Sequence, residues 1–277
     1  MSLMLKLLAT SLLLGSIAHA NSTQEKVEDF LNDQFSKNSQ LKSVDVTVDN
    51  EKNIKQLKGW KAYVVNIEAR LKSNPKNLIK QKMIWFSNGE VITKDLTFLQ
   101  SGDNLTDIIK PDFKAKYYKK ENLIYGNANA KHKIAIFSDP LCPFCRSFVP
   151  GALKEMKKEP NKYAVYYYHL PLLRIHPASA VLVQAAVVAE LKGVKEVVAK
   201  LYNVKVKVDE KDPKKILKAF NKAMGTSVTL KDLQNPKIKE QIQFDAMVAN
   251  DIMVAGTPTI YLDGKMDRTK NKYKKVK

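Results

Sequence analysis

The chain has 277 residues, a formal net charge of +19 at pH 7 and only two cysteines. Its lysines are spread along the chain, which disfavours nucleic-acid binding and favours a solvated surface with weak attraction to anionic membranes or acidic proteins. A zinc site needs about four ligands. His169 and His176 flank a proline-containing turn without ligand-like spacing, so we predict no metal.

Residues 1–20 have the pattern of a secretory signal peptide. Lys6 is followed by an apolar run and then by Ala18-His19-Ala20, a cleavage site of the A-x-A type. The run is too short to span a bilayer, although an uncleaved anchor is the alternative, and no other apolar stretch approaches that length. We therefore predict an exported protein whose remaining chain has room for two domains.

Residues 21–100 predict a small α+β domain. Apolar residues recur at helical spacing over 23–38, and a residue among Asn21, Ser22 and Thr23 can cap that helix. Apolar runs then predict strands over residues 44–48, 60–71, 78–86 and 91–93. The domain holds no group of chemistry-bearing residues, so we expect a role in structure or association, with an isolated client-binding or protective domain as the alternative.

Residues 101–122 have the pattern of a linker that is partly helical. Residues 103–109 can open a helix, which Pro111 ends or kinks. Phe113 and Tyr117 follow and indicate a second helical stretch. We expect a semi-rigid connection between the two domains.

Cys142 and Cys145 form a C-x-x-C pair between two predicted elements. The apolar run 134–137 before them is typical of a buried strand, and residues 146–156 after them of a helix. Cys142 is therefore at or near a helix N-terminus, where the helix dipole and unpaired N–H groups stabilise a thiolate. The pair is predicted to cycle between dithiol and disulfide. A purely structural disulfide is the alternative, but so short a loop removes little chain entropy.

The second domain, residues 123–277, is predicted to mix strands and helices. A strand over 163–171 is followed by a helical insertion at about 178–252. Its helices are predicted over residues 178–201 (interrupted at Gly193), 213–224 and 236–252. The sequence Gly256-Thr257-Pro258-Thr259 then opens another strand, Asp263-Gly264 makes a hairpin turn, and the lysine-rich end at 270–277 predicts a basic edge strand.

The strand, C-x-x-C and helix, with Gly-Thr-Pro-Thr before a later strand, resemble the active site of a thioredoxin-fold protein. The phrase FSDPLCPFC, Thr257 and the long N-terminal extension most resemble the periplasmic DsbC/DsbG group of disulfide isomerases. The resemblance covers residues 132–277 by motif and 21–125 by layout only. It implies an α+β N-terminal domain, which serves for dimerisation in that group, and an α/β thioredoxin-like domain with a helical insertion.

The resemblance also implies roles for the residues of the C-x-x-C motif. Cys142 is expected to be the nucleophile and the more exposed thiol, and Cys145 the buried thiol that resolves mixed disulfides. Pro143 and Phe144 are expected to tune the potential. Oxidants of the DsbA kind carry Pro-His between their cysteines, so Phe144 implies a less oxidising pair.

Thr257 and Pro258 are implied to bind the client chain, with Pro258 in the cis form facing the cysteines. Oxidants of the DsbA kind typically carry Val before this proline, whereas Thr257 matches the isomerase group. No cofactor is implied beyond the redox-active disulfide Cys142–Cys145. The implied partners are unfolded or misoxidised exported proteins, a membrane redox partner (a DsbD-like reductase or a DsbB-like oxidase) and a second copy of the chain, without nucleic acid.

The chain departs from related sequences near the cysteines. Thioredoxins bury an aspartate six residues before the first cysteine, where this chain has Ile136, so an efficient buried proton acceptor is not expected. Asp139 is expected to be exposed at the turn, and His169 and His176 to cap turns or pack. No C-terminal amphipathic helix is evident.

The sequence leaves two other functions open. The protein could be a net oxidant of the DsbA kind, or a holdase chaperone that binds unfolded clients without redox chemistry. The Cys142→Ala substitution distinguishes these functions, because a chaperone would keep its client-binding activity and an exchange enzyme would lose its disulfide-exchange activity.

Overall fold

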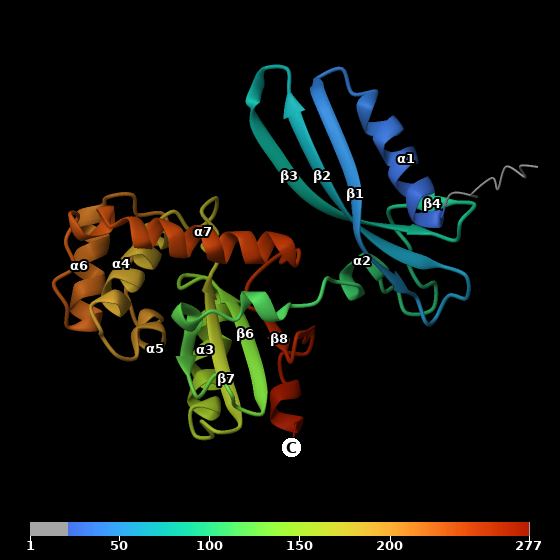
Figure 1. Ribbon diagram of the computed structural model, residues 1–277. Coiled ribbons are helices and arrows are strands. Elements are labelled where there is room, and N and C mark those ends of the chain that lie inside the picture. The colour runs from blue at the N-terminus through green and yellow to red at the C-terminus, as the bar shows by residue number, and fades with distance from the viewer. Residues whose placement is uncertain (1–21, 277) are drawn as a thin grey trace, which may run out of the picture. The chain divides into compact units, whose positions relative to one another are not determined.

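The computed structural model describes residues 22–276, so the predicted signal peptide lies outside the described residues. The chain divides into two compact units, with the boundary between Leu96 and Thr97. The first unit combines a helix with an antiparallel sheet. The second combines a mixed sheet with helices (Figure 1). The predicted fold class, α+β followed by α/β with a helical insertion, is confirmed.

The first unit begins with α1 (Thr23–Ser36) and continues with the antiparallel sheet β1-β2-β3-β4. The strands are β1 (Leu41–Asn53), β2 (Lys61–Leu71), β3 (Asn74–Ser87) and β4 (Ile92–Thr93). Ser22 caps α1: its hydroxyl accepts from Glu25 N at 3.2 Å, and the Glu25 carboxylate accepts from Ser22 N at 2.7 Å. The apolar face of α1 packs on the sheet through Val27 and Leu31, which are buried.

The second unit is built on a five-stranded sheet in the order β5-β7-β6-β8-β9. The strands are β5 (Leu123–Tyr125), β6 (His132–Ser138), β7 (Tyr163–His169), β8 (Thr259–Leu262) and β9 (Lys265–Met266). β6 and β7 are parallel and the other pairs are antiparallel. Helix α3 (Pro143–Met156) connects β6 to β7 and packs on the sheet through a buried apolar face.

The helical insertion lies between β7 and β8 and has an apolar core of its own. Its elements are α4 (Ser179–Leu191), α5 (Val197–Leu201), α6 (Pro213–Met224), the 3-10 helix η3 (Asp232–Gln234) and α7 (Pro236–Asp251). Helix α7 also packs on the sheet, where Val248 and Ile252 join a buried aromatic cluster. The insertion is therefore anchored to the same sheet that carries the cysteines.

The predicted linker, residues 101–122, is a connection in its first half and part of a folded core in its second half. It contains α2 (Leu105–Ile108) and the 3-10 helices η1 (Ala115–Tyr117) and η2 (Lys120–Asn122). Phe113 and Tyr117 are buried against the sheet beside Phe137 and Tyr168, because their rings complete the aromatic cluster on that face. The second half of this segment is thus part of the core of the second unit.

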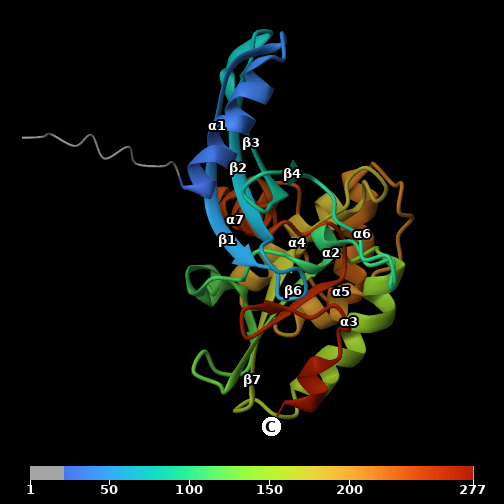
Figure 2. The ribbon, with the colours of Figure 1, turned by 90° about the vertical axis from the view of Figure 1, so that its right-hand side faces the viewer.

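The chain ends differently from the prediction. Residues 272–275 form the 3-10 helix η4 (Lys272–Lys275) instead of an edge strand. The reason is Tyr273, whose ring is buried and whose hydroxyl donates to Glu155 of α3 at 2.6 Å. Figure 2 shows this C-terminal segment lying beside α3. No helix among residues 22–276 is long and apolar enough to cross a membrane.

Candidate active site

The two cysteines lie at the junction of β6 and α3. Cys142 is the N-cap of α3, and Pro143 occupies the first helical position, where its missing N–H costs no hydrogen bond. Both thiols are free. Cys142 is 4% exposed and Cys145 is 0% exposed, so the predicted order of exposure holds, although both are buried.

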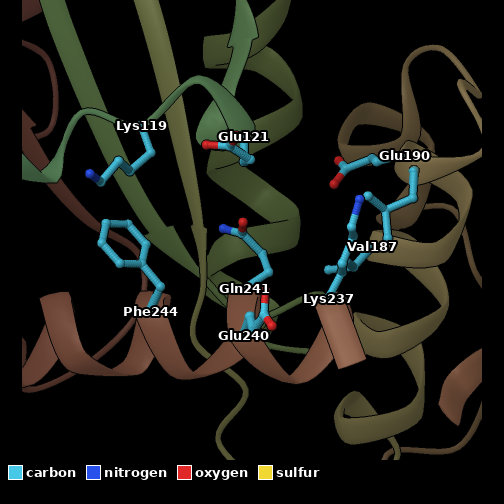
Figure 3. Close-up of a pocket in the computed structure, with 9 residues that line it drawn as sticks. Lys119, Glu121, Val187, Glu190, Lys237, Glu240, Gln241 and Phe244 are labelled. Atoms are coloured by element: carbon cyan, nitrogen blue, oxygen red, sulfur yellow. The ribbon is translucent and has the colours of Figure 1, made fainter. Parts of the chain in front are cut away.

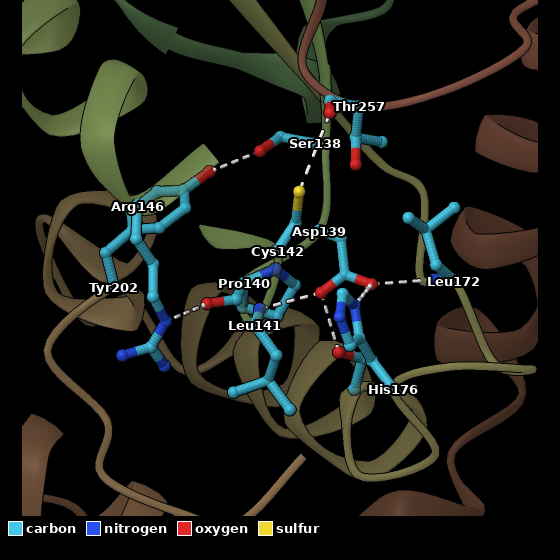
Figure 4. A network of polar contacts seen from close by, with 11 residues as sticks. Ser138, Asp139, Pro140, Leu141, Cys142, Arg146, Leu172, His176, Tyr202 and Thr257 are labelled. Carbon is cyan, nitrogen blue, oxygen red and sulfur yellow. Dashed lines mark hydrogen bonds and ion pairs between the residues drawn. The ribbon is translucent and has the colours of Figure 1, made fainter. Parts of the chain in front are cut away.

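The strand β8 brings Thr257 and Pro258 to the cysteines. β8 pairs antiparallel with β6, and Thr259 lies opposite Phe137, five residues before Cys142. The Thr257–Pro258 peptide bond is cis, as predicted. The Cys142 thiol donates to the Thr257 carbonyl at an Sγ–O distance of 3.6 Å (Figure 4). The two motifs, far apart in sequence, therefore form one site.

Cys145 is in an environment that favours the neutral thiol. Burial raises the pKa of the Cys145 thiol to about 11, and proximity to Cys142 adds to the shift. Hydroxyls of Ser138 and Thr257 act in the opposite direction. Cys145 therefore holds its proton at neutral pH, which suits a resolving thiol that acts after Cys142.

The prediction of an exposed Asp139 is wrong. Asp139 is fully buried, and its carboxylate accepts hydrogen bonds from Leu141 N, Leu172 N and Ser179 Oγ, each at 2.7 Å. A ring nitrogen of His176 lies 3.0 Å from the same carboxylate (Figure 4). The start of the helical insertion covers this turn, which sequence proximity does not reveal. The only local signal is an Asp two residues before the Leu141 amide, the pattern of an Asx turn.

Arg146 secures the same turn from the other side. Its Nε donates to the Pro140 carbonyl and its terminal nitrogen to the Val204 carbonyl, both at 2.8 Å. Pro140 precedes the cysteines, and Val204 belongs to the insertion. The backbone leading to Cys142 is therefore fixed by hydrogen bonds to the insertion on two sides, which sequence analysis did not predict.

A chain of buried hydroxyls adjoins Cys145. The Ser138 hydroxyl lies 2.7 Å from the Tyr202 hydroxyl, which in turn lies 2.7 Å from that of Tyr167. Ser138 ends β6, Tyr167 is on β7 and Tyr202 follows α5. Burial raises the pKa of both tyrosines above its ordinary value, so they remain neutral donors. This row of three hydrogen-bonded hydroxyls was not predicted from the sequence.

His169 is buried, as expected for a packing residue. Its ring packs against Tyr167, with centroids 5.0 Å apart, and burial lowers the pKa of His169 to about 4. Its backbone N–H donates to the Asp245 carboxylate at 2.9 Å. His169 is therefore neutral at physiological pH and does not supply a proton to the cysteines.

A family model described as Thioredoxin matches residues 119–277, more than half of the chain. The match includes both cysteines and the Thr257–Pro258 bond. This chain belongs to the thioredoxin family. The chain is accordingly a thiol–disulfide oxidoreductase, and the matched segment holds its two cysteines and the cis-proline.

Several solved structures resemble the thioredoxin unit in fold. ScsC of Proteus mirabilis in a compact conformation is 23% identical over 55% of this chain and 67% of its own, with a TM-score of 0.45. A periplasmic thioredoxin-like protein of Salmonella enterica serovar Typhimurium is 24% identical over 55% of this chain and 84% of its own, with a TM-score of 0.45. BdbD of Bacillus subtilis, in its oxidised form, is 15% identical over 60% of this chain and 92% of its own, with a TM-score of 0.46. These likenesses concern fold alone. A comparison with curated proteins gives no significant match.

Exposed apolar side chains and a cavity lie near the two cysteines and Pro258. Phe144 is 73% exposed beside Cys142, and Leu173 and Ile175 are exposed on the loop that donates to Asp139. A cavity of about 500 Å³ lies along the segment that includes Thr257 and Pro258. The roles of Pro143, Phe144, Thr257 and Pro258 in redox tuning and client binding stay predictions.

A separate cavity of about 590 Å³ lies between the insertion and the segment around η2 (Figure 3). Its lining mixes charged and apolar side chains: Lys119, Glu121, Val187, Glu190, Leu191, Lys237, Glu240, Gln241 and Phe244. Burial, reinforced by Asp245, raises the pKa of Glu190 to about 8. Among residues 22–276 no group of three or more His, Cys, Asp or Glu side chains is arranged to hold a metal ion.

Proposed function

We propose that this thioredoxin-family protein is a disulfide isomerase or reductase of exported proteins, of the DsbC/DsbG kind, acting in the periplasm. The observation that carries the proposal is the Cys142 thiol, 3.6 Å from the carbonyl of Thr257 and next to a cis-proline. An extended client segment that pairs with the backbone at Thr257 would present its disulfide to this thiol.

The proposed chemistry starts with the Cys142 thiolate. It attacks one sulfur of a client disulfide, so that a mixed disulfide forms and the other client cysteine leaves as a thiolate. In isomerisation that thiolate attacks a different client disulfide, and a client thiolate finally displaces Cys142. In reduction Cys145 attacks Cys142 instead, which releases a client dithiol and leaves the Cys142–Cys145 disulfide. A membrane reductase of the DsbD kind would return two electrons to the pair.

Two residues support isomerase or reductase activity over net oxidation. Phe144 provides no imidazole to stabilise the Cys142 thiolate, and its exposure makes it a contact residue for apolar client segments. Thr257 has a backbone carbonyl that accepts from Cys142, and its side chain carries a hydroxyl in place of one methyl of the nearly isosteric valine. A net oxidant of the DsbA kind, recharged by a DsbB-like oxidase, is the alternative that the assay below distinguishes.

We further propose that the protein works as a homodimer through its first unit. Strand β1 pairs only with β2 among the described strands, and side chains of α1 bond part of its other edge: Asn32 to the Val46 backbone and Glu28 to Val48 N. The proposed contact with a second chain would use the remainder of this 13-residue edge. An unpaired strand edge is a template for pairing with another chain. A dimer would place two cysteine pairs around one client.

The test is reactivation of scrambled ribonuclease in a glutathione buffer, beside oxidation of fully reduced ribonuclease. An isomerase restores the scrambled substrate, and Cys142→Ala abolishes this activity. Gain of activity only with the reduced substrate would identify an oxidant. Suppression of client aggregation that survives Cys142→Ala, without reactivation, would identify a holdase chaperone.

A further inference from the structure

The cavity of about 500 Å³ beside Pro258 is bounded by side chains from three further parts of the second unit. They come from the region of α2, from the end of α7 and from the segment after β9: Asp107, Lys110, Met253, Asp267, Arg268 and Lys270. A volume of this size is within the range of ligand-binding pockets. The cavity therefore lies directly along the backbone at which a client segment is proposed to pair.

The lining of this cavity has more positive than negative side chains. Its cations are Lys110, Arg268 and Lys270, and its carboxylates are Asp107 and Asp267. Asp267 is 2% exposed, and its carboxylate accepts three hydrogen bonds of 2.7 to 3.0 Å from residues 269 and 272. Since the protein's own donors satisfy Asp267, the three cations exceed the remaining carboxylate of the lining, Asp107.

Two of the three cations are weakly compensated. Burial lowers the pKa of Lys110, and Asp107 acts in the opposite direction. A partly desolvated ammonium gains stability from a nearby anion. The terminal nitrogen of Arg268 lies 3.7 Å from the Asp103 carboxylate, but both side chains are about half exposed, and such pairs contribute little. An anionic group in the cavity would therefore be favoured.

The backbone around the cavity is unusual at two positions. Met253 has a φ of 56° and Lys270 a φ of 57°, and they are two of the four non-glycine residues with positive φ that residues 22–276 contain. Met253 follows the C-cap of α7, a position at which glycine is usual. Both side chains line the cavity in spite of this steric cost, and residues held in such conformations cluster at binding sites.

We propose that this basic cavity binds an Asp or Glu side chain of the client, close to the client cysteine that reacts with Cys142. The inference rests on the proposed exchange activity and adds a substrate class to it: exported proteins with acidic residues beside their cysteines. When an extended segment pairs with a backbone, its alternate side chains point to opposite sides, and pockets for those side chains supply specificity. A client paired at Thr257 would direct its cysteine to Cys142 and a neighbouring side chain into the cavity.

The experiment uses the full chain with Cys145→Ser, which prevents resolution, and with glutathione joined to Cys142. A peptide thiolate attacks Cys142 Sγ, a disulfide between the peptide and Cys142 forms, and glutathione leaves as a thiolate. Two peptides are compared, each with one cysteine and with its four nearest neighbours either all Glu or all Gln. Acid quench and mass spectrometry give the equilibrium constants at about 0.15 M salt, where charges more than about 8 Å apart are largely screened.

We expect the change from Gln to Glu peptide to favour the mixed disulfide about two- to tenfold more in this chain than in a variant with both Arg268→Gln and Lys270→Gln. Comparing the same two peptides in both proteins cancels the intrinsic chemistry of the peptide thiols. Lys270→Gln alone should lose part of the preference, and it serves if the double variant does not fold. Arg268→Lys, which keeps the charge, should keep the preference.

The matched control combines Lys218→Gln with Lys222→Gln, because both lysines are exposed on α6 and their replacement removes the same charge outside the cavity. This control should keep the preference for the Glu peptide. An equal loss in the control would assign the preference to the net charge of the chain and overturn the inference. An absent preference, or one that is unaltered in the folded cavity variants, would also overturn it.

The peptide equilibrium is independent of the ribonuclease assay, because it needs neither a second client disulfide nor resolution by Cys145. Failure to reactivate scrambled ribonuclease together with the expected preference would remove the proposed isomerase activity and leave the basic cavity as a client site. Reactivation without any preference for the Glu peptide would have the opposite meaning.

Discussion

At the scale of single residues, the site separates its two thiols by their surroundings. Cys142 is the N-cap of α3, next to the backbone of Thr257, where a client segment would pair. Cys145 is one turn further along α3, inside the core, where burial raises its pKa to about 11. Under the proposed function, Cys142 would attack and Cys145 would resolve, in keeping with their different surroundings on one helix.

Phe144 offers a test of how the intervening residues set the potential. Its side chain is 73% exposed, so replacement leaves the core intact. Phe144→His adds an imidazole that can stabilise the neighbouring thiolate and thereby the reduced form. We expect a potential more positive by tens of millivolts, about 30 mV for each 1.4 kcal/mol of stabilisation. Equilibration with glutathione measures the change. Phe144→Leu, which adds no imidazole, is the control, and an equal change in both variants would contradict the prediction.

At the scale of elements, the insertion fixes the turn between β6 and α3 through Asp139. Asp139→Ala leaves four donors without their acceptor, on Leu141, Leu172, His176 and Ser179. We expect a loss of about 3 kcal/mol or more in the free energy of unfolding, measured by denaturant titration. Ser179→Ala removes a single bond and should cost about 1 kcal/mol. Equal, small effects of both substitutions would show that the carboxylate does not organise the turn.

The insertion also predicts a pH dependence of stability. Figure 3 shows Glu190 of α4 pointing into the 590 Å³ cavity, and burial raises its pKa from 4.5 to about 8. A folded-state pKa above the unfolded value means that stability is fully present below about pH 4.5 and declines as pH rises toward 8. Glu190→Gln should remove this decline.

The expected gain of Glu190→Gln is on the order of 1 to 2 kcal/mol at about pH 8.5, allowing for solvent screening of a half-buried group. Thermal or denaturant unfolding of both proteins between about pH 4.5 and pH 8.5 measures it. Glu25→Gln, in the exposed first turn of α1, is a control that removes a carboxylate outside the cavity, because Gln can also accept from Ser22 N in a capping box. Parallel profiles for the unaltered chain and Glu190→Gln would refute the assignment.

At the scale of the whole molecule, the first unit presents the outer edge of β1, of which α1 side chains bond the backbone at Val46 and Val48. If it associates through that edge, sedimentation equilibrium of the exported chain should give twice the monomer mass. A chain that begins at Thr97, the start of the second unit, should then be monomeric. A monomeric mass for the full chain, at concentrations well above the micromolar range, would contradict the dimer.

Much of this architecture could be predicted from the sequence because its signals are local. The apolar run before Cys142, the helical pattern after Cys145 and the strand after Pro258 each depend on residues within one element. The helices of the insertion were likewise predicted within a few residues of α4, α6 and α7. The thiol order and the cis-proline came from motif resemblance, which is local as well.

Contacts between elements that are distant along the chain were decided only by the tertiary structure. Asp139 is buried because the loop at Leu172 and the start of α4 fold over it. The hydroxyl chain exists because Ser138, Tyr167 and Tyr202 come together from two strands and the insertion. Burial and hydrogen-bond partnership depend on every element that packs at a point, so periodicity along one segment does not encode them. The sequence by itself determined the cysteine pair, the proline motif and the elements that carry them, whereas the packing of the insertion determined the burial and hydrogen-bond partners of the turn around the cysteines.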